Sequence, residues 1–134
     1  MKQILLIEND RPLQLLIKEE LVDEGYVVWV VSDGFEAISM LNGTSYKPDL
    51  IILDVRLSQK DVFEFIGRTL KLGIDIPVII YTSYTACKLR PLTYADAYVI
   101  KSHDLSILKA TIHDLLHNKD KSYERRGEVC MRDL

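Results

Sequence analysis

The chain has 134 residues and a formal net charge of −3, with 48% hydrophobic and 28% charged residues. This length suits one domain that buries a core without disulfides or a structural metal. The acidic balance argues against nucleic-acid binding, and no apolar stretch approaches the roughly 20 residues of a membrane span. The N-terminus turns acidic at Glu8, too early for a signal peptide, and Cys87 and Cys130 form no metal or redox motif. We expect a reduced, cytoplasmic protein.

Five short apolar runs divide the chain. They cover residues 4–7, 27–31, 50–53, 77–81 and 97–100. Most are rich in Val and Ile, and several are apolar at every position. Strands that are buried on both faces have this composition, so the runs predict a parallel sheet.

A helix is predicted after the first run, because apolar residues recur at helical spacing: Leu13, Leu16, Ile17 and Leu21. Asp10 is placed to be its N-cap, Pro12 falls in the first turn, and Gly25 ends it. The second helix is predicted over residues 34–41, with Ala37, Ile38 and Leu41 directed inward. The third carries Phe63, Ile66 and Leu70 and ends at Gly73. The last is capped by Asp104 and carries Leu105, Leu108, Ile112, Leu115 and Leu116.

The segment from Ser83 to Tyr94 gives a weaker helical signal. It has few apolar residues at helical spacing, and Pro91 lies inside it. Because a proline within a helix costs about 3 kcal/mol, we predict a short or irregular fourth helix.

Strands and helices therefore alternate five times, which indicates an α/β fold with helices on both faces of a parallel sheet. Right-handed crossovers favour the flavodoxin-like doubly wound arrangement of five strands in the order 2-1-3-4-5. Residues 1–118 would form one domain. Residues 119–134 are mostly polar and are interpreted as a C-terminal tail.

Polar residues follow four of the predicted strands. They are Glu8 and Asn9, Asp54, Thr82, and Lys101. Open parallel sheets bind ligands beyond the carboxyl ends of their strands, near the point where the strand order reverses. The predicted order therefore brings these residues into one pocket.

The chemistry of this set is complementary. Carboxylate and amide oxygens suit a hard cation such as Mg²⁺, and a lysine ammonium and a threonine hydroxyl suit a phosphoryl group. A central carboxylate, Asp54, can be the nucleophile that forms an aspartyl phosphate. The metal and Lys101 would neutralise charge on the transferring group.

Five segments together resemble the receiver domains of two-component response regulators. The segments are ILLIEND at 4–10, SDGFEAI at 32–38, DLIILDVRL at 49–57, PVIIYT at 77–82 and ADAYVIK at 95–101. Each is a weak signal by itself, but all five occur in order, and the resemblance covers residues 1–117.

The resemblance implies a role for each matching residue. Asp54 would accept a phosphoryl group from a histidine kinase or phosphotransfer protein. Glu8 and Asn9 would hold Mg²⁺ together with the backbone carbonyl of Arg56. Thr82 and Lys101 would contact the phosphoryl group, and Tyr98 would turn inward with Thr82 on activation. Such a domain is a phosphoacceptor that assists its own phosphoryl transfer and hydrolysis, and it is not an enzyme with an external substrate. We expect it to act on a downstream protein, as a monomer or weak dimer.

The chain also departs from the family pattern. Asn9 stands where an aspartate is usual, which keeps an oxygen ligand but removes one negative charge, so it predicts weaker Mg²⁺ binding. The other departures are Ser58, Val62, Ser83 and Ser102, and a shortened stretch between Thr82 and Lys101.

Alternative functions remain open from the sequence. Asn9 is compatible with a degenerate pseudo-receiver that acts as a phosphorylation-independent interaction module. A flavodoxin-like flavin carrier shares the strand order but requires a Ser/Thr/Gly-rich loop where Glu8-Asn9-Asp10-Arg11 stands. A phosphatase with an aspartate nucleophile would carry that residue after the first strand.

His113 and His117 are four residues apart on the last helix and are either a metal-binding pair or part of a solvated face.

Overall fold

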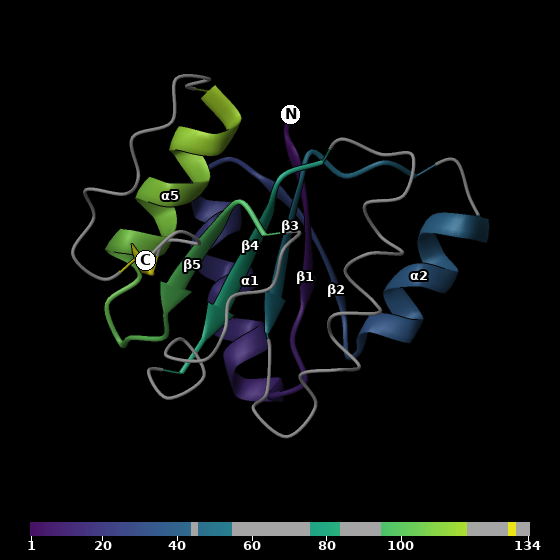
Figure 1. The fold of residues 1–134 in the computed structure, drawn as a ribbon, viewed down its shortest axis with the longest axis horizontal. Helices are drawn as coiled ribbons and strands as arrows, with labels where there is room; N and C mark the ends of the chain where they lie inside the picture. Colours follow the sequence, from purple (N-terminus) through teal and green to yellow (C-terminus); the bar gives the residue numbers. More distant parts are fainter. Residues whose placement is uncertain (44–45, 55–75, 84–94, 118–128, 131–134) are drawn as a thin grey trace.

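The computed structural model describes residues 1–43, 46–54, 76–83, 95–117 and 129–130. The elements are β1 (Gln3–Ile7), α1 (Arg11–Asp23), β2 (Val27–Val31), α2 (Gly34–Gly43), β3 (Leu50–Asp54), β4 (Val78–Thr82), β5 (Ala97–Ile100), α5 (Ser106–His117) and β6 (Val129–Cys130) (Figure 1). All five predicted strands are present. The predicted third helix, with Phe63, Ile66, Leu70 and Gly73, lies outside the described residues, as do residues 84–94 of the predicted fourth helix.

The sheet has the strand order β2-β1-β3-β4-β5-β6. The first five strands are parallel, so the predicted order 2-1-3-4-5 is confirmed. The predicted five-stranded sheet omitted β6, which pairs antiparallel with β5 and lies within the segment interpreted as a tail. Its two residues are too few to show a hydrophobic period, so the sequence alone could not indicate it.

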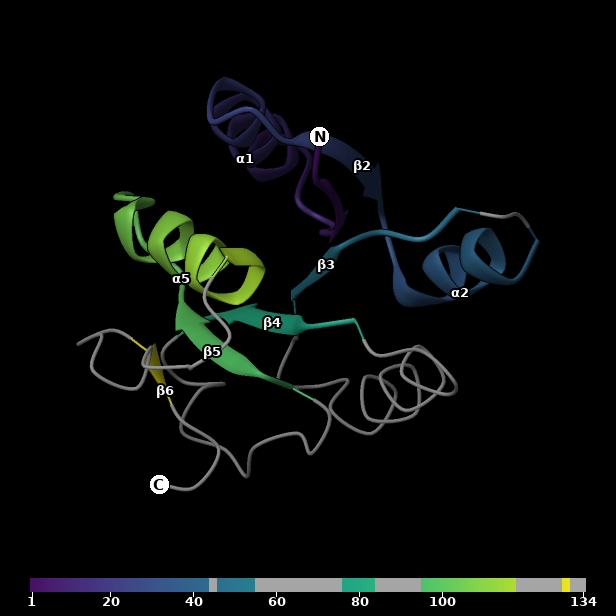
Figure 2. The ribbon, with the colours of Figure 1, turned by 90° about the horizontal axis from the view of Figure 1, so that it is seen from above.

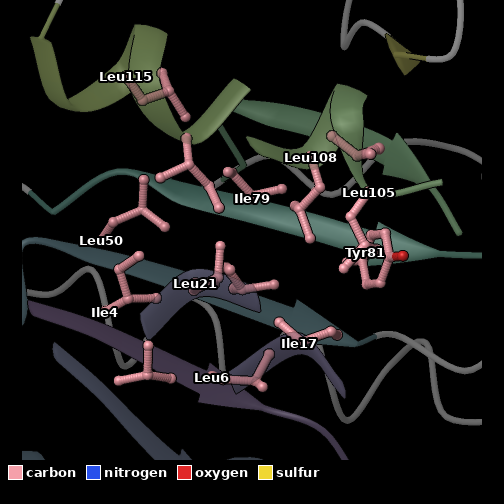
Figure 3. Packing of buried hydrophobic residues seen from close by; sticks show 14 of the residues in the cluster. Ile4, Leu6, Ile17, Leu21, Leu50, Ile79, Tyr81, Leu105, Leu108 and Leu115 are labelled. Carbon is pink, nitrogen blue, oxygen red and sulfur yellow. The ribbon is translucent and has the colours of Figure 1, made fainter. Parts of the chain in front are cut away.

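Side chains alternate between the two faces of the sheet and form two cores. On one face, the strands pack against α1 and α5, with Ile4, Leu6, Leu50 and Ile79 among the buried residues (Figure 3). On the other face, the odd-numbered residues of β1 and β3 pack with Ala37 of α2. Figure 2 shows α1 and α5 together on one side of the sheet and α2 on the opposite side. No helix in the described part of the chain is long and apolar enough to cross a membrane.

Two carboxylates hold the sheet together at the edge opposite to the strands' carboxyl ends. Asp49 precedes β3 and accepts a hydrogen bond from the backbone N–H of Gln3 (2.7 Å). Asp96 precedes β5 and accepts one from the N–H of Val78 (2.7 Å). Each carboxylate accepts a hydrogen bond from an N–H at the start of a neighbouring strand. At this edge the two carboxylates therefore stabilise the sheet.

The first helix differs from the prediction in two ways. Asp10 is the N-cap residue of α1, but its side chain makes no capping hydrogen bond. Leu16, predicted to be inward, is 43% exposed, whereas Gln14 is buried with Ile17 and Leu21. Residues 14, 17 and 21 recur at the helical period, and the Gln14 amide donates a hydrogen bond to the backbone carbonyl of Glu8. This bond compensates the burial of a polar side chain.

Gly25 and Asp104 lie at the end of α1 and the start of α5, as predicted. Gly25 follows α1 with φ of +98°, a left-handed conformation that favours glycine. At α5, the Asp104 carboxylate accepts hydrogen bonds from the backbone N–H (2.9 Å) and the hydroxyl of Ser106. The predicted apolar face of α5 is buried at Leu105, Leu108, Ile112 and Leu115, and Leu116 is partly buried.

Candidate functional site

The predicted site residues lie at the carboxyl edge of the sheet. Asp54 is the last residue of β3, Thr82 is the last residue of β4, and Glu8 and Lys101 directly follow β1 and β5. Because β1, β3, β4 and β5 are consecutive parallel neighbours, their ends meet at one edge. The carboxyl ends of these four strands therefore lie together, as the strand order predicted.

One ammonium joins two carboxylates at this edge. Lys101 Nζ lies 2.9 Å from Asp54 Oδ1 and 3.4 Å from Glu8 Oε1. Glu8 is only 1% exposed and Asp54 8%, whereas the Lys101 side chain is 28% exposed. The cluster is thus buried on its acidic side and reaches solvent through the lysine.

The alternation of side chains explains why these three groups meet. Glu8 continues the series of Ile4 and Leu6, and Asp54 continues that of Leu50 and Ile52. Both series face α1 and α5, as do the residues of β5 that alternate with Tyr98. Lys101 follows Ala97 and Val99 in the alternation of β5, so the cluster lies at the end of the α1/α5 face.

Burial and mutual charge shift the pKa values of two groups in the cluster. Burial, reinforced by the neighbouring charge of Asp54, raises the pKa of Glu8 above its ordinary value. Burial alone would lower the pKa of Lys101, but the hydrogen bond to Asp54 and the charges of Asp54 and Glu8 outweigh it and raise that pKa. Glu8 Oε2 accepts a hydrogen bond from the N–H of Asp10 (3.1 Å), whereas the buried Oε1 has no hydrogen-bond partner in the described part of the protein.

Thr82 joins the site from the other face of the sheet. It is 1% exposed, and its backbone carbonyl accepts a hydrogen bond from the N–H of Lys101 (2.6 Å). Thr82 follows Val78 and Ile80 on the face of β4 that packs in the α2 core, and that core includes Tyr98, which is 5% exposed. The predicted switch residues are thus both buried, and the Tyr98 ring is already directed inward.

Two further metal ligands were predicted, Asn9 and the backbone carbonyl of Arg56. Asn9 is exposed in the turn between β1 and α1, directly after Glu8. Arg56, whose carbonyl was predicted as a ligand, lies outside the described residues.

Two residues of the site were not predicted. Gln14 fixes the backbone of Glu8 through its amide, and its only signal in the sequence was a polar residue at the period of Ile17 and Leu21. Tyr81 was assigned to the fourth strand without a role. Its ring lies beneath Lys101, with Nζ 5.9 Å from the ring centroid, and its hydroxyl donates to the carbonyl of Ser102 (3.5 Å). Both residues support the ion cluster from the α1/α5 side.

Comparison with known proteins places this arrangement in a family. The response regulator MprA of Mycobacterium bovis is 30% identical over 133 residues, which cover 97% of this chain and 56% of that protein. The structure of the response regulator TrrA from Thermotoga maritima in complex with Mg²⁺ and BeF is 29% identical, with a TM-score of 0.74 over 87% of this chain and 100% of that chain. TrrA in complex with the histidine kinase ThkA gives 29% identity and a TM-score of 0.72, over 87% of this chain and 99% of that chain.

The curated relatives and the family model differ in how much of each the chain covers. The chain spans only 51% to 56% of the length of the first curated relatives that it matches. The family model of the response regulator receiver domain, in contrast, matches residues 4–113, which include every residue of the ion cluster. The chain therefore belongs to the response regulator receiver domain family of two-component systems.

Proposed function

We propose that this receiver domain accepts a phosphoryl group on Asp54 from a histidine kinase or phosphotransfer protein, and that it signals through a changed protein-interaction surface. The observation that carries the proposal is the contact of Asp54 with Lys101 (2.9 Å) at the carboxyl end of the central strand β3. The buried carboxylate can act as the nucleophile, and the partly exposed ammonium beside it can bind an incoming anion.

The transfer is a substitution at phosphorus. A carboxylate oxygen of Asp54 forms the new bond to phosphorus, and the bond between phosphorus and the donor's leaving atom breaks, with its electron pair retained by the leaving group. Lys101 pairs with Asp54 before the transfer and neutralises charge on the phosphoryl oxygens during it. Glu8 keeps a second negative charge beside Lys101, which holds the ammonium at the site.

The donor set fits a hard divalent cation. Glu8 and Asp54 share a single ammonium, and Glu8 Oε1 is buried without a hydrogen-bond partner among the described residues. Glu8, Asn9 and Asp54, with the carbonyl of Arg56, would hold Mg²⁺, which prefers oxygen ligands. When bound, Mg²⁺ offsets the negative charge that accumulates during phosphoryl transfer. The Mg²⁺ complex of the relative TrrA supports this assignment.

The signal would leave the site through Thr82. Its buried hydroxyl-bearing side chain belongs to the α2 face, on the same side as Tyr98. A phosphoryl group on Asp54 would attract the Thr82 hydroxyl and change the packing around Tyr98 on β5. Such a local charge change can bias a packed element between two arrangements.

The ThkA complex of TrrA supports a histidine kinase as the donor.

The test is phosphorylation of the purified chain by acetyl phosphate with Mg²⁺, measured by intact mass spectrometry. One phosphoryl group is expected on the wild type and none on Asp54→Asn. Asp23→Asn changes an exposed aspartate of α1 in the same way and should be labelled like the wild type. Labelling that persists in Asp54→Asn would show that Asp54 is not the acceptor.

A second candidate function rests on Asn9. An amide at this exposed position removes one charge from the cation site, as in a pseudo-receiver that binds its partners without phosphorylation. Under that function the wild type stays unlabelled in the same experiment although it is folded.

A further inference from the structure

A pair of histidines lies on the exposed side of α5, away from the phosphorylation site. His113 and His117 are both exposed, and their ring centroids are 4.6 Å apart with the planes tilted by 39°. The opposite side of α5 is buried at Leu108, Ile112 and Leu115. The rings are therefore directed toward solvent and are in contact with one another.

The position of the pair favours a cation. Residues four apart on a helix face the same direction one turn apart, which is the spacing of the two zinc-binding histidines in the helical H-E-x-x-H motif. His117 is the last residue of α5, where the unpaired carbonyls of a helix end carry partial negative charge. Asp114 lies three residues before His117 and adds a carboxylate to the same end of the helix.

We propose that His113 and His117 together bind one divalent transition-metal cation of borderline softness, such as Zn²⁺, Ni²⁺ or Cu²⁺, through one nitrogen of each ring. Imidazole is a preferred ligand of these ions, whereas the oxygen-rich set around Asp54 suits Mg²⁺. The described residues contain no group of three or more His, Cys, Asp or Glu side chains positioned for a metal. Among the described residues, the pair supplies two ligands of the proposed site.

Binding would have a structural consequence at the end of α5. The metal would link two successive turns of the helix and hold its last turn in place. A ligand that binds only the folded chain stabilises it in proportion to the logarithm of its concentration. The pair therefore predicts a rise in Tm with added Ni²⁺ that depends on both histidines.

The test uses the full chain and Ni²⁺, with excess Mg²⁺ present throughout to occupy the oxygen site. Isothermal titration should give one Ni²⁺ per chain for the wild type. His113→Gln and His117→Gln should each weaken binding by about tenfold or more, because the second ligand acts at a high effective concentration. His103→Gln is the matched control, since His103 is the remaining histidine of the chain and is exposed before α5.

The outcomes are distinct. Loss of affinity and of the Tm shift in both pair variants, with His103→Gln unchanged, supports the site. Ni²⁺ binding that survives in the double variant His113→Gln/His117→Gln, or that is lost equally in His103→Gln, overturns it. All three residues are exposed, so circular dichroism should report an unchanged fold in each variant.

Discussion

Lys101 balances two carboxylates that would otherwise repel one another. Asp54 and Glu8 both lie within 3.4 Å of its ammonium, and both are at least nine-tenths buried. The cluster has two carboxyl groups and one ammonium, and the amide of Asn9 adds no charge beside it. A site of this kind attracts a cation, but less strongly than one with a third carboxylate.

The residue-scale prediction concerns Asn9. Asn9→Asp should tighten Mg²⁺ binding, on the order of tenfold, because a carboxylate replaces an amide beside Glu8 and adds a negative charge to a set of oxygen ligands. The measurement is a Mg²⁺ titration of both proteins at one ionic strength. Asn42→Asp makes the same substitution at an exposed position of α2 and should leave the affinity unchanged. Equal affinities in the wild type and Asn9→Asp would show that position 9 does not contribute to the metal site.

At the scale of elements, α5 depends on contacts at its beginning. Asp104 accepts hydrogen bonds from the hydroxyl and the backbone N–H of Ser106, and these bonds hold the pKa of its carboxyl below its ordinary value. Lys109 then joins α5 to α1 through an ion pair with Glu20 (2.6 Å). These contacts fix the first turn of α5, which packs on the sheet face that carries the ion cluster.

This gives a prediction with a defined pH dependence. A carboxyl whose pKa is lowered on folding stabilises the folded state above its unfolded pKa, and this contribution is lost as the pH falls through the folded pKa. Asp104→Asn should therefore be less stable than the wild type at neutral pH, and the difference should shrink in the acidic range. Urea unfolding at a series of pH values measures it. A difference that stays constant or grows as the pH falls would contradict the role of the charge.

At the scale of the whole molecule, two cores on opposite faces of one sheet support a site at the sheet's edge. The α1/α5 core carries the strands that end in Glu8 and Asp54, and the α2 core includes Tyr98. Since each of the strands β1 to β5 contributes to both cores, loss of packing on one face weakens the strands that position the site.

The corresponding prediction is the cost of truncating the core. Ile79 in β4 is completely buried on the α1/α5 face. Ile79→Ala should lower the free energy of unfolding by about 2–5 kcal/mol, from lost burial and the cavity left behind. Leu15→Ala removes an apolar side chain that is 59% exposed and should change it by less than about 0.5 kcal/mol. Denaturant unfolding compares the two, and equal effects would mean that the described core does not carry the stability.

Much of the fold could be predicted because its signals are local. Runs such as residues 50–53 are apolar at every position, and the helices between them begin and end at recognisable residues such as Pro12 and Gly25. Parallel strands also obey a strand-end rule, so the polar residues that follow them identified the edge at which Glu8, Asp54 and Lys101 meet. The sequence by itself thus determined the order of the five parallel strands and the edge at which the three charged residues meet.

Only the tertiary structure decided how these residues interact. That Lys101 contacts both carboxylates, that Gln14 rather than Leu16 is buried, and that β6 pairs with β5 all depend on distances between segments far apart in the chain. Hydrophobic period assigns a residue to a face, but it does not give the partner that compensates a buried polar group. That partner is set by the packing of one element on another, because the cost of burying a charge or an amide is met only by the specific atoms placed beside it.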